Sequence, residues 1–324
     1  MVYKTLLETI GNTPLIRIPF STPATILAKL EYCNPSNSLK DRSALYMIEQ
    51  AEKRGKLKPG GTIIDASSGN HGISVAMIGR AKGYKVIIVV STKTSKEKLA
   101  TLHAYGAQVV VCEPTPFIEN ENSYHKVSQR LAASLPNACM LNQYYNTENR
   151  DAHYTLLGPE LWSQTEGTIT HFFAGAGTGG TISGVGRYLK KQNPKITICA
   201  VDALTSFRAT KGNPKPYKIE GLGIDFTSDV LDYSVIDYFA EISDDSAFNA
   251  LRMLVKDYGL LVGPTSGAVV AACLEKLSTF TEKDVVVLTF GDSGRAYLSK
   301  NFYIQSADSQ ENIIPLSTQE QISL

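Results

Sequence analysis

Short apolar runs rich in β-branched residues alternate with helix-length segments along most of this 324-residue chain. The strand-like runs are 26–30, 62–66, 85–90, 108–112, 170–174, 196–202 and 284–290. Helices are predicted at 43–52, 71–82, 95–105, 123–134, 152–164, 181–191, 244–258 and 268–277. Nearly continuous apolar strands separated by helices indicate parallel sheets that are covered on both faces. We therefore expect an α/β protein with two doubly wound, mostly parallel sheets.

The strand-like runs form two series, and the polar, proline-rich stretch 113–122 lies between them as a predicted loop. One series ends near residue 112, and the other begins near residue 170. A chain of this length fits two α/β domains or one large domain. The mostly polar stretch from Ile304 onward is predicted to be a tail or a short cap.

Charge and hydropathy argue against several classes of function. The chain has 32 lysine and arginine residues against 31 aspartate and glutamate residues, so no basic surplus indicates nucleic-acid binding. No run approaches the about 18 apolar residues of a membrane span, and the N-terminal segment has no long apolar stretch. We expect a cytoplasmic protein that acts on small molecules, with no nucleic-acid or membrane partner.

The five cysteines lie far apart and form no Cys-x-x-Cys pair. They are Cys33, Cys112, Cys139, Cys199 and Cys273. Three of them fall in apolar runs, so we expect buried thiols rather than a disulfide framework or a zinc site. The histidines at positions 103, 125, 153 and 171 show no metal-ligand spacing. We expect no bound metal and a packing role for these histidines.

Lys40 lies in the stretch 34–42, Asn-Pro-Ser-Asn-Ser-Leu-Lys-Asp-Arg, between a strand-like run and a helical pattern. A desolvated lysine at the mouth of a strand–loop–helix unit can form a Schiff base with an aldehyde cofactor. Taken alone, a solvated lysine at a helix start explains the same residues. Two further loops weigh against this simpler explanation.

The first loop is the stretch 67–72, Ser-Ser-Gly-Asn-His-Gly, which connects the run 62–66 to the next helix. Free backbone N–H groups at a helix start, with hydroxyls beside them, can bind a carboxylate or a phosphate. The amide of Asn70 can bond a phenolic oxygen. Ordinary helix capping by serine and asparagine is the alternative for this stretch.

The second loop is the stretch 175–181, Gly-Ala-Gly-Thr-Gly-Gly-Thr, which follows an apolar run and opens a helix. Its glycines let the backbone approach an anion closely, and its threonines supply hydroxyl donors. Gly175, Gly177 and Gly180 also match the dinucleotide pattern G-x-G-x-x-G, with Asp202 about twenty residues further on. A nicotinamide enzyme is therefore an alternative for this loop, although no hydride-transfer partner is evident.

A third candidate loop, 263–267, has the sequence Gly-Pro-Thr-Ser-Gly and precedes a helix. Its hydroxyls could meet a ring nitrogen or could simply cap the helix. Taken in order, the loops resemble those of the fold-type II pyridoxal-phosphate enzymes (the tryptophan synthase β-like fold), and within them the cystathionine β-synthase and cysteine synthase family. The resemblance extends from about Leu7 to Tyr303. Other matching stretches are 10–16, 104–107, 142–144, 220–223 and 291–293.

The resemblance implies pyridoxal 5′-phosphate as the cofactor and a role for each loop. Lys40 is expected to form the Schiff base and to move the α-proton, and Asn70 is expected to bond the 3′-oxygen. The expected phosphate-binding residues are Gly177, Thr178, Gly179, Gly180 and Thr181. Thr265 is expected to face the pyridine nitrogen, with Ser266 beside it. The expected ligands of the substrate carboxylate are Ser67, Ser68, Gly69, His71 and Gln143.

The resemblance also implies β-replacement on L-serine or an activated serine, through an aminoacrylate that a thiol attacks. The stretches 123–131, 142–146 and 217–226 favour the cystathionine β-synthase branch, which joins serine to homocysteine. A cysteine synthase, which uses O-acetylserine or O-phosphoserine with sulfide, is the alternative. A serine/threonine dehydratase is a further alternative, whereas the intact Lys40 argues against a scaffold without catalysis.

By the same resemblance, residues 1–39 plus 146–324 are expected to form a larger cofactor-binding domain, and residues 40–145 a smaller, mobile, substrate-binding domain. A homodimer is also expected. Three positions depart from the family pattern: His71 replaces a usual threonine, Ile224 a usual tyrosine and Asn37 a frequent glycine. The chain shows neither the haem-binding extension nor the regulatory module of some relatives, so we expect no control by haem or an adenosyl ligand.

Overall fold

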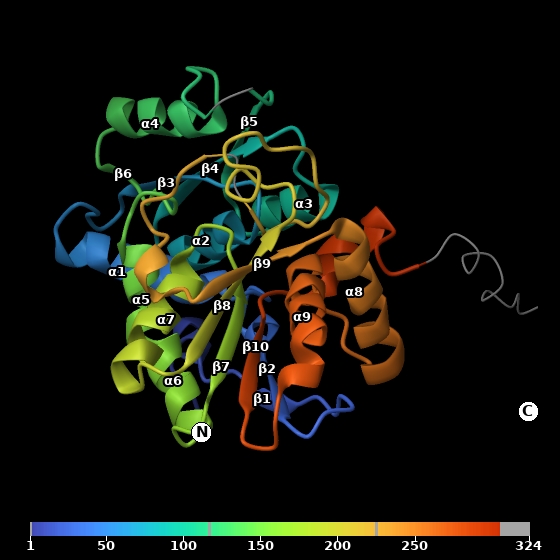
Figure 1. Cartoon of the computed structure of the whole chain (residues 1–324). Coiled ribbons are helices and arrows are strands. Elements are labelled where there is room, and N and C mark those ends of the chain that lie inside the picture. Colours follow the sequence, from blue (N-terminus) through green and yellow to red (C-terminus); the bar gives the residue numbers. More distant parts are fainter. Residues whose placement is uncertain (1, 116–117, 224–225, 305–324) are drawn as a thin grey trace, which may run out of the picture.

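The computed structural model describes residues 2–115, 118–223 and 226–304, which form two sheets with helices packed on them (Figure 1). The larger sheet contains, in spatial order, β1 (Leu15–Arg17), β2 (Thr25–Leu30), β10 (Val285–Phe290), β7 (His171–Gly175), β8 (Thr197–Ala203) and β9 (Tyr238–Ile242). Its neighbouring strands run parallel, except that β1 is antiparallel to β2. The smaller sheet is parallel and contains β5 (Gln108–Cys112), β4 (Lys85–Ser91), β3 (Thr62–Ala66) and β6 (Ala138–Met140).

Helices cover both faces of each sheet, as the alternation of runs predicts. On the larger sheet, one face carries α8 (Asp244–Tyr258) and α9 (Pro264–Lys276), and the other carries α5 (Glu148–Thr155), α6 (Leu157–Gln164) and α7 (Gly180–Gln192). On the smaller sheet, α1 (Lys40–Lys53), α2 (Asn70–Ala81) and α3 (Lys96–Ala104) lie on one side, and α4 (Tyr124–Ser134) lies on the other (Figure 1). The predicted α/β fold class is therefore confirmed.

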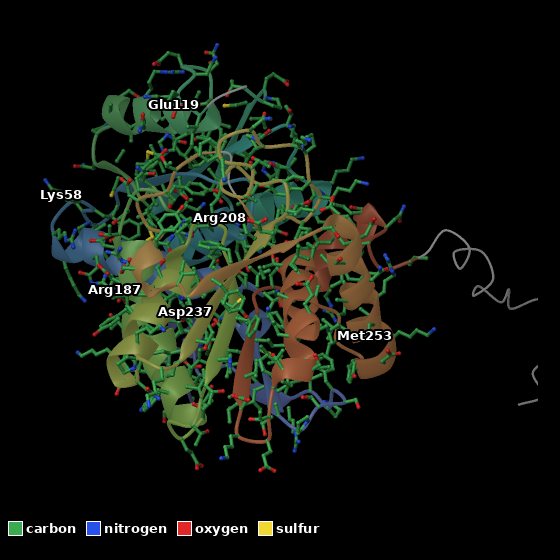
Figure 2. All side chains as sticks on the ribbon, in the orientation of Figure 1. Lys58, Glu119, Arg187, Arg208, Asp237 and Met253 are labelled. Atoms are coloured by element: carbon green, nitrogen blue, oxygen red, sulfur yellow. The ribbon has the colours of Figure 1, made fainter. Side chains whose placement is uncertain are left out.

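The central strands of the larger sheet are apolar because both of their faces are buried. Successive residues of a strand point to opposite faces. Accordingly, Phe173 and Val286 join the core beneath α8 and α9, whereas Phe172 and Val287 join the core beneath α6 and α7. A third core joins α1 and α2 to the smaller sheet. Charged side chains such as Lys58, Glu119 and Arg187 lie on the outer surface (Figure 2).

The predicted strands agree with the structure to within one residue at each end. Three strands, β1, β6 and β9, were not predicted, because the first two have only three residues each and β9 contains a glutamate. The predicted helix 152–164 is wrong as a single element, since it is interrupted at Leu156 between α5 and α6. Pro159 explains the break, because it lacks the N–H group that would bond the preceding turn.

The cysteines are less buried than expected. Cys199 and Cys273 are buried, but Cys33 is exposed, and Cys112 and Cys139 are half-buried. The expectation of three buried thiols fails at Cys112, because β5 is an edge strand. Within the described ranges, no helix is both long enough and apolar enough to cross a bilayer. The same residues contain no cluster of histidine, cysteine or acidic side chains that could hold a metal ion.

Candidate active site

The predicted site residues meet between the two sheets, at the carboxyl ends of β3, β7 and β10. A cavity of about 340 Å³ is lined by Lys40, by the stretch 67–71 and by Gln143 and Gly177. A narrower extension of about 60 Å³ continues past the glycine loop to Thr265. Every predicted site residue borders one of these two spaces. Ligands of parallel α/β sheets bind at this edge.

Lys40 is the first residue of α1, and the residues before it are held against the end of β10. Leu39 donates its N–H to the carbonyl oxygen of Gly291 at 2.8 Å. Asn37 has a φ of +63°, a left-handed conformation that asparagine tolerates in place of glycine. Burial lowers the pKa of the Lys40 ammonium to about 8, although the charge of Asp292 opposes the shift. The amine is therefore easily deprotonated, as a nucleophile requires.

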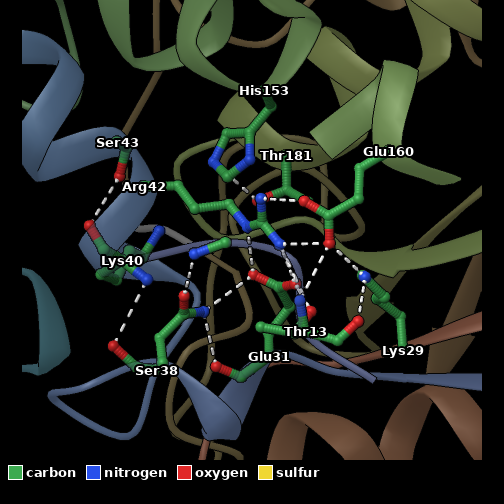
Figure 3. A network of polar contacts seen from close by, with 12 residues as sticks. Thr13, Lys29, Glu31, Ser38, Lys40, Arg42, Ser43, His153, Glu160 and Thr181 are labelled. Carbon is green, nitrogen blue, oxygen red and sulfur yellow. Dashed lines mark hydrogen bonds and ion pairs between the residues drawn. The ribbon is translucent and has the colours of Figure 1, made fainter. Parts of the chain in front are cut away.

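A buried network of ions fixes the start of α1 to the larger sheet (Figure 3). Arg42 donates from Nε to Glu31 at 2.7 Å and from Nη1 to Glu160 at 2.7 Å. Lys29 also donates to Glu160. Burial alone would raise the pKa of Glu160, but the hydrogen bonds and charges of Arg42 and Lys29 lower it to about 2. Because Glu31 follows β2 and Glu160 lies in α6, the network holds Lys40 in place from two sides.

The stretch 67–71 ends β3 and begins α2. Ser67 Oγ accepts a hydrogen bond from the N–H of Gly72 at 3.0 Å, and Ser68 Oγ accepts one from the N–H of Ser91 at 2.9 Å. Because each hydroxyl oxygen accepts from the backbone, its own hydrogen can be donated into the cavity. With the free N–H groups at the start of α2, these hydroxyls form a site suited to an anion.

The glycine loop leads into α7 and is closely packed. Gly179 precedes the helix with a φ of +89°, in the region that favours glycine. A Cβ at Gly177 would lie 2.5 Å from the carbonyl oxygen of Gly221. Asn149 supports the loop by donating from Nδ2 to Thr178 Oγ1 at 3.1 Å. The N–H groups at the start of α7, where that of Gly180 also donates to Thr178 Oγ1 at 3.3 Å, make this loop a suitable phosphate site.

Thr265 and Thr181 are among the threonines that border the narrow extension. Thr265 Oγ1 donates to the carbonyl oxygen of Glu220 at 2.8 Å, so this oxygen keeps lone pairs that can accept a hydrogen bond. Thr181 Oγ1 lies 3.2 Å from His153 Nε2 (Figure 3). Burial, together with the charges of Lys40 and Arg42, lowers the pKa of His153 and keeps its ring neutral.

Asn70 and Asp292 meet across the two sheets. Asn70 Nδ2 donates to Asp292 Oδ2 at 2.6 Å, and the hydroxyl of Tyr297 donates to the same oxygen. Burial raises the pKa of Asp292, against the lowering effect of these two hydrogen bonds. Asp292 was not among the predicted site residues, although the stretch 291–293 belongs to the resemblance. Its position directly after β10 is the signal that could have identified it.

Lys98 and Glu220 also border the cavity without having been predicted. Lys98 Nζ lies 2.5 Å from Glu220 Oε2, and Lys300 bonds the other carboxylate oxygen. The Lys98 ammonium also lies 4.7 Å from the centre of the Tyr297 ring. No local pattern distinguishes Lys98 from the other lysines of its helix. Ile224, which departs from the family pattern, lies outside the described residues.

His71 and Asp65 form a buried pair on the cavity wall. His71 borders the cavity but is only 1% exposed, and its Nε2 lies 3.3 Å from Asp65 Oδ2. Burial raises the pKa of Asp65, and burial together with the charge of Lys40 lowers the pKa of His71. His71 was predicted as a site residue, whereas Asp65 looked like an ordinary strand residue.

Several proteins of known function or structure are similar to this chain. The family model described as "pyridoxal-phosphate dependent enzyme" matches residues 6–292. The chain is 42% identical over 304 residues to cystathionine beta-synthase of Apis mellifera, covering 91% of this chain and 60% of that relative. It is 38% identical over 304 residues to cysteine synthase B of Pseudomonas aeruginosa, covering 93% and 98%. A crystal structure of O-acetylserine dependent cystathionine beta-synthase from Helicobacter pylori matches with a TM-score of 0.86 at 38% identity, covering 94% and 100%.

The chain belongs to the pyridoxal-phosphate dependent enzyme family, and it has the fold-type II architecture that its loops predict. It spans 60% of the length of the Apis mellifera relative. The family match decides against a nicotinamide enzyme. The carboxylate of Asp202 is instead bonded by Arg208 Nε at 2.6 Å and by Ser206 Oγ at 2.7 Å.

The residues around Lys40 fit pyridoxal 5′-phosphate, which is the cofactor of this family. The lowered pKa of the Lys40 amine suits reaction with an aldehyde, and the start of α7 suits a phosphate. Gly177 and Gly221 both border these spaces, and a Cβ at Gly177 would meet the carbonyl oxygen of Gly221, so only glycine fits there. Among the described residues, the buried hydroxyls of Thr289, which borders the extension, and of Ser266 have no hydrogen-bond partner.

Proposed function

We propose that this enzyme catalyses β-replacement, in which a thiol takes the place of the β-substituent of L-serine or of an activated serine. The preferred reaction is that of a cystathionine β-synthase, which joins serine to homocysteine. The alternative is a cysteine synthase that uses O-acetylserine or O-phosphoserine with sulfide. One observation carries the proposal: a single cavity places Lys40 between the start of α7 and the stretch 67–71.

The cofactor would be held by groups of the larger sheet and by one residue of α2. The N–H groups and hydroxyls of residues 177–181 would hold the phosphate, because they lie at a helix start. Asn70, fixed by its bond to Asp292, would bond the 3′-oxygen. The hydroxyl of Thr265 would form a hydrogen bond with the nitrogen of the pyridine ring. Bound pyridoxal phosphate supplies an electron sink for the α-carbon of the substrate.

The substrate carboxylate would bind at the start of α2, to the hydroxyls of Ser67 and Ser68, the N–H groups of Gly69 and His71, and the amide of Gln143. Lys40 Nζ would take the proton from the α-carbon and return it after the thiol has added. The lowered pKa of Lys40 suits both transfers, because a general base works best when its pKa is near the working pH.

We further propose that residues 40–145 move as a small domain against residues 1–39 plus 146–324, and exclude water when substrate binds. The separate cores of the two sheets support this division. A homodimer is proposed because Leu6 and Leu156 remain exposed on the single chain. A cytoplasmic location is proposed because the cysteines form no disulfide, which fits a reducing compartment.

The test is to supply purified protein, loaded with pyridoxal phosphate, with L-serine or O-acetyl-L-serine and with homocysteine or sulfide. Mass spectrometry would identify the product as cystathionine or cysteine. Pyruvate formed from serine at a rate independent of thiol would instead establish a dehydratase. No thioether or thiol product from any combination would refute β-replacement. Light scattering on the same sample would test for twice the chain mass.

A further inference from the structure

The imidazole ring of His71 has no task in the proposed function, because only the backbone N–H of this residue would bind the substrate carboxylate. His71 lines the cavity that Lys40 also borders, although its side chain is only 1% exposed and both ring nitrogens are buried. Within the described part of the chain, neither ring nitrogen makes a hydrogen bond. A buried, unpaired imidazole at a reaction site needs an explanation, because unpaired buried polar groups are costly.

Asp65 is held so that one carboxylate oxygen faces His71. Its Oδ1 accepts the backbone N–H of Asn142 at 3.1 Å, whereas its Oδ2 lies 3.3 Å from His71 Nε2 and has no hydrogen bond to any described residue. Asp65 is the last residue but one of β3 and His71 is the second residue of α2, so two rigid elements fix their separation. Lys40 lies close enough for its charge to disfavour a charged imidazolium. The pair therefore holds one proton between a carboxyl group and a neutral ring.

We propose that His71 is a catalytic acid–base group that protonates the β-hydroxyl of L-serine, and that Asp65 is its positioning residue. This inference rests on the proposed function and narrows its substrate to a β-hydroxy amino acid with no activating ester. A hydroxyl must gain a proton to leave as water, whereas acetate or phosphate leaves without one. A proton donor at this wall would help a hydroxyl to leave, and an ester does not need one.

The proton transfers balance over one turnover. The bond between the β-carbon and the hydroxyl oxygen breaks, and the oxygen keeps the electron pair and takes the proton of His71 Nδ1. Asp65 Oδ2 passes its proton to His71 Nε2. When the thiol adds, its sulfur forms the new bond to the β-carbon and its proton goes to Nδ1. The proton on Nε2 then returns to Asp65, so the pair is restored and one water is released.

The decisive measurement is the ratio of turnover with L-serine to turnover with O-acetyl-L-serine, in the loaded enzyme and with one thiol. We expect His71→Asn to lower turnover of L-serine by about 100-fold more than turnover of the ester, which is the usual effect of losing a general acid. Because both substrates are compared in one preparation, partial unfolding cancels. Asp65→Asn should lower the same ratio by a smaller factor. This variant tests the proposal if His71→Asn does not fold.

His171→Asn is the matched control, because it makes the same change beside another aspartate. His171 Nδ1 lies 3.6 Å from Asp284 Oδ1, at the opposite ends of β7 and β10 from the cavity. The ratio should not change in this variant. Imidazole nitrogen NMR of the loaded enzyme without substrate gives a readout that is independent of activity. The His71 signals, identified by their loss in His71→Asn, should show a proton on Nδ1.

Three results would overturn the inference alone: equal loss with both substrates in His71→Asn, wild-type enzyme that uses only the ester, or a His71 ring without a proton on Nδ1. A wild-type enzyme that converts neither L-serine nor the ester with any thiol would refute the proposed function itself. The two failures are therefore distinguishable. A selective loss with L-serine, together with a protonated Nδ1, supports the inference.

Discussion

Arg42 Nη1 lies 2.7 Å from Glu160 Oε2, although 118 residues separate the two in the chain. Arg42 is two residues beyond Lys40 in α1, and Glu160 lies in α6 on the larger sheet. Their side chains are only 2% and 11% exposed. The pair therefore joins the helix that carries Lys40 to a helix of the larger sheet. Each of the two buried charges compensates the other.

Replacing Glu160 by glutamine should lower the free energy of unfolding by about 3–5 kcal/mol, because the positive charges of Arg42 and Lys29 would stay buried without this carboxylate. Urea denaturation followed by circular dichroism measures the loss. Glu121→Gln is the control, since Glu121 pairs with Arg130 but is 77% exposed, and it should cause no measurable change. Equal stability losses in the two variants would contradict a structural role for the buried network.

Acid should destabilise the fold through Glu160. Its pKa is about 2 in the folded protein, below the value of about 4.3 for an unfolded chain. A lowered folded-state pKa gives stability that is fully present above the unfolded pKa and is lost as the pH falls toward the folded pKa. Urea midpoints measured from neutral pH downward should fall between about pH 5 and pH 2. In Glu160→Gln the urea midpoint should fall less steeply with decreasing pH. An unchanged pH dependence would show that other carboxylates cause the acid sensitivity.

Lys40→Ala should abolish covalent attachment of the cofactor and lower β-replacement by at least about 100-fold, since the variant lacks both nucleophile and base. Borohydride treatment followed by peptide mass spectrometry should find a modified lysine in the wild type, at position 40, and none in the variant. Lys58→Ala, on the outer surface (Figure 2), is the control and should keep both properties. A label on another lysine would disprove the assignment.

Gly177→Ala should weaken binding of pyridoxal phosphate by at least about tenfold, or about 1.4 kcal/mol. The added Cβ would lie 2.5 Å from the carbonyl oxygen of Gly221, and a backbone group cannot easily move away. Fluorescence titration of the cofactor-free protein measures the affinity. Gly186→Ala, two turns along α7, is the control because its Cβ would meet only movable side chains at 3.1 Å or more. Equal affinities in both variants would show that the close approach of Gly177 to Gly221 does not affect cofactor binding.

Lys98→Ala should loosen the contact between α3 and the segment that contains Glu220. Lys98 bonds Glu220 at 2.5 Å, and burial of this carboxylate would raise its pKa if the charges of Lys98 and Lys300 did not lower it. Hydrogen exchange of backbone amides in residues 96–104 should become faster. Lys96→Ala, an exposed change on the same helix, should leave exchange unaffected. Identical exchange in the two variants would contradict a clamp between Lys98 and Glu220.

The loops of the site could be predicted because each is local. The stretch 175–181 shows its glycines beside its strand and helix, and Lys40 is marked by the order of the loops around it. Contacts between distant segments have no local sequence pattern that predicts them. Asn70 and Asp292 are 222 residues apart, and Lys98 and Glu220 are 122 apart. Only the packing of the two sheets brings these side chains together. The division of the chain at residues 40 and 145 stays a prediction.

Lys40 lies where the chain passes from the larger sheet to the smaller one. The N–H of Leu39 is bonded to Gly291 at the end of β10, whereas α1 is packed in the core of the smaller sheet. If residues 40–145 rotate as one body, displacement grows with distance from the axis. A lysine near that axis would move little, while groups farther from the axis would move more. The reactive amine would thus remain stationary through opening and closing, and the substrate would be carried to it.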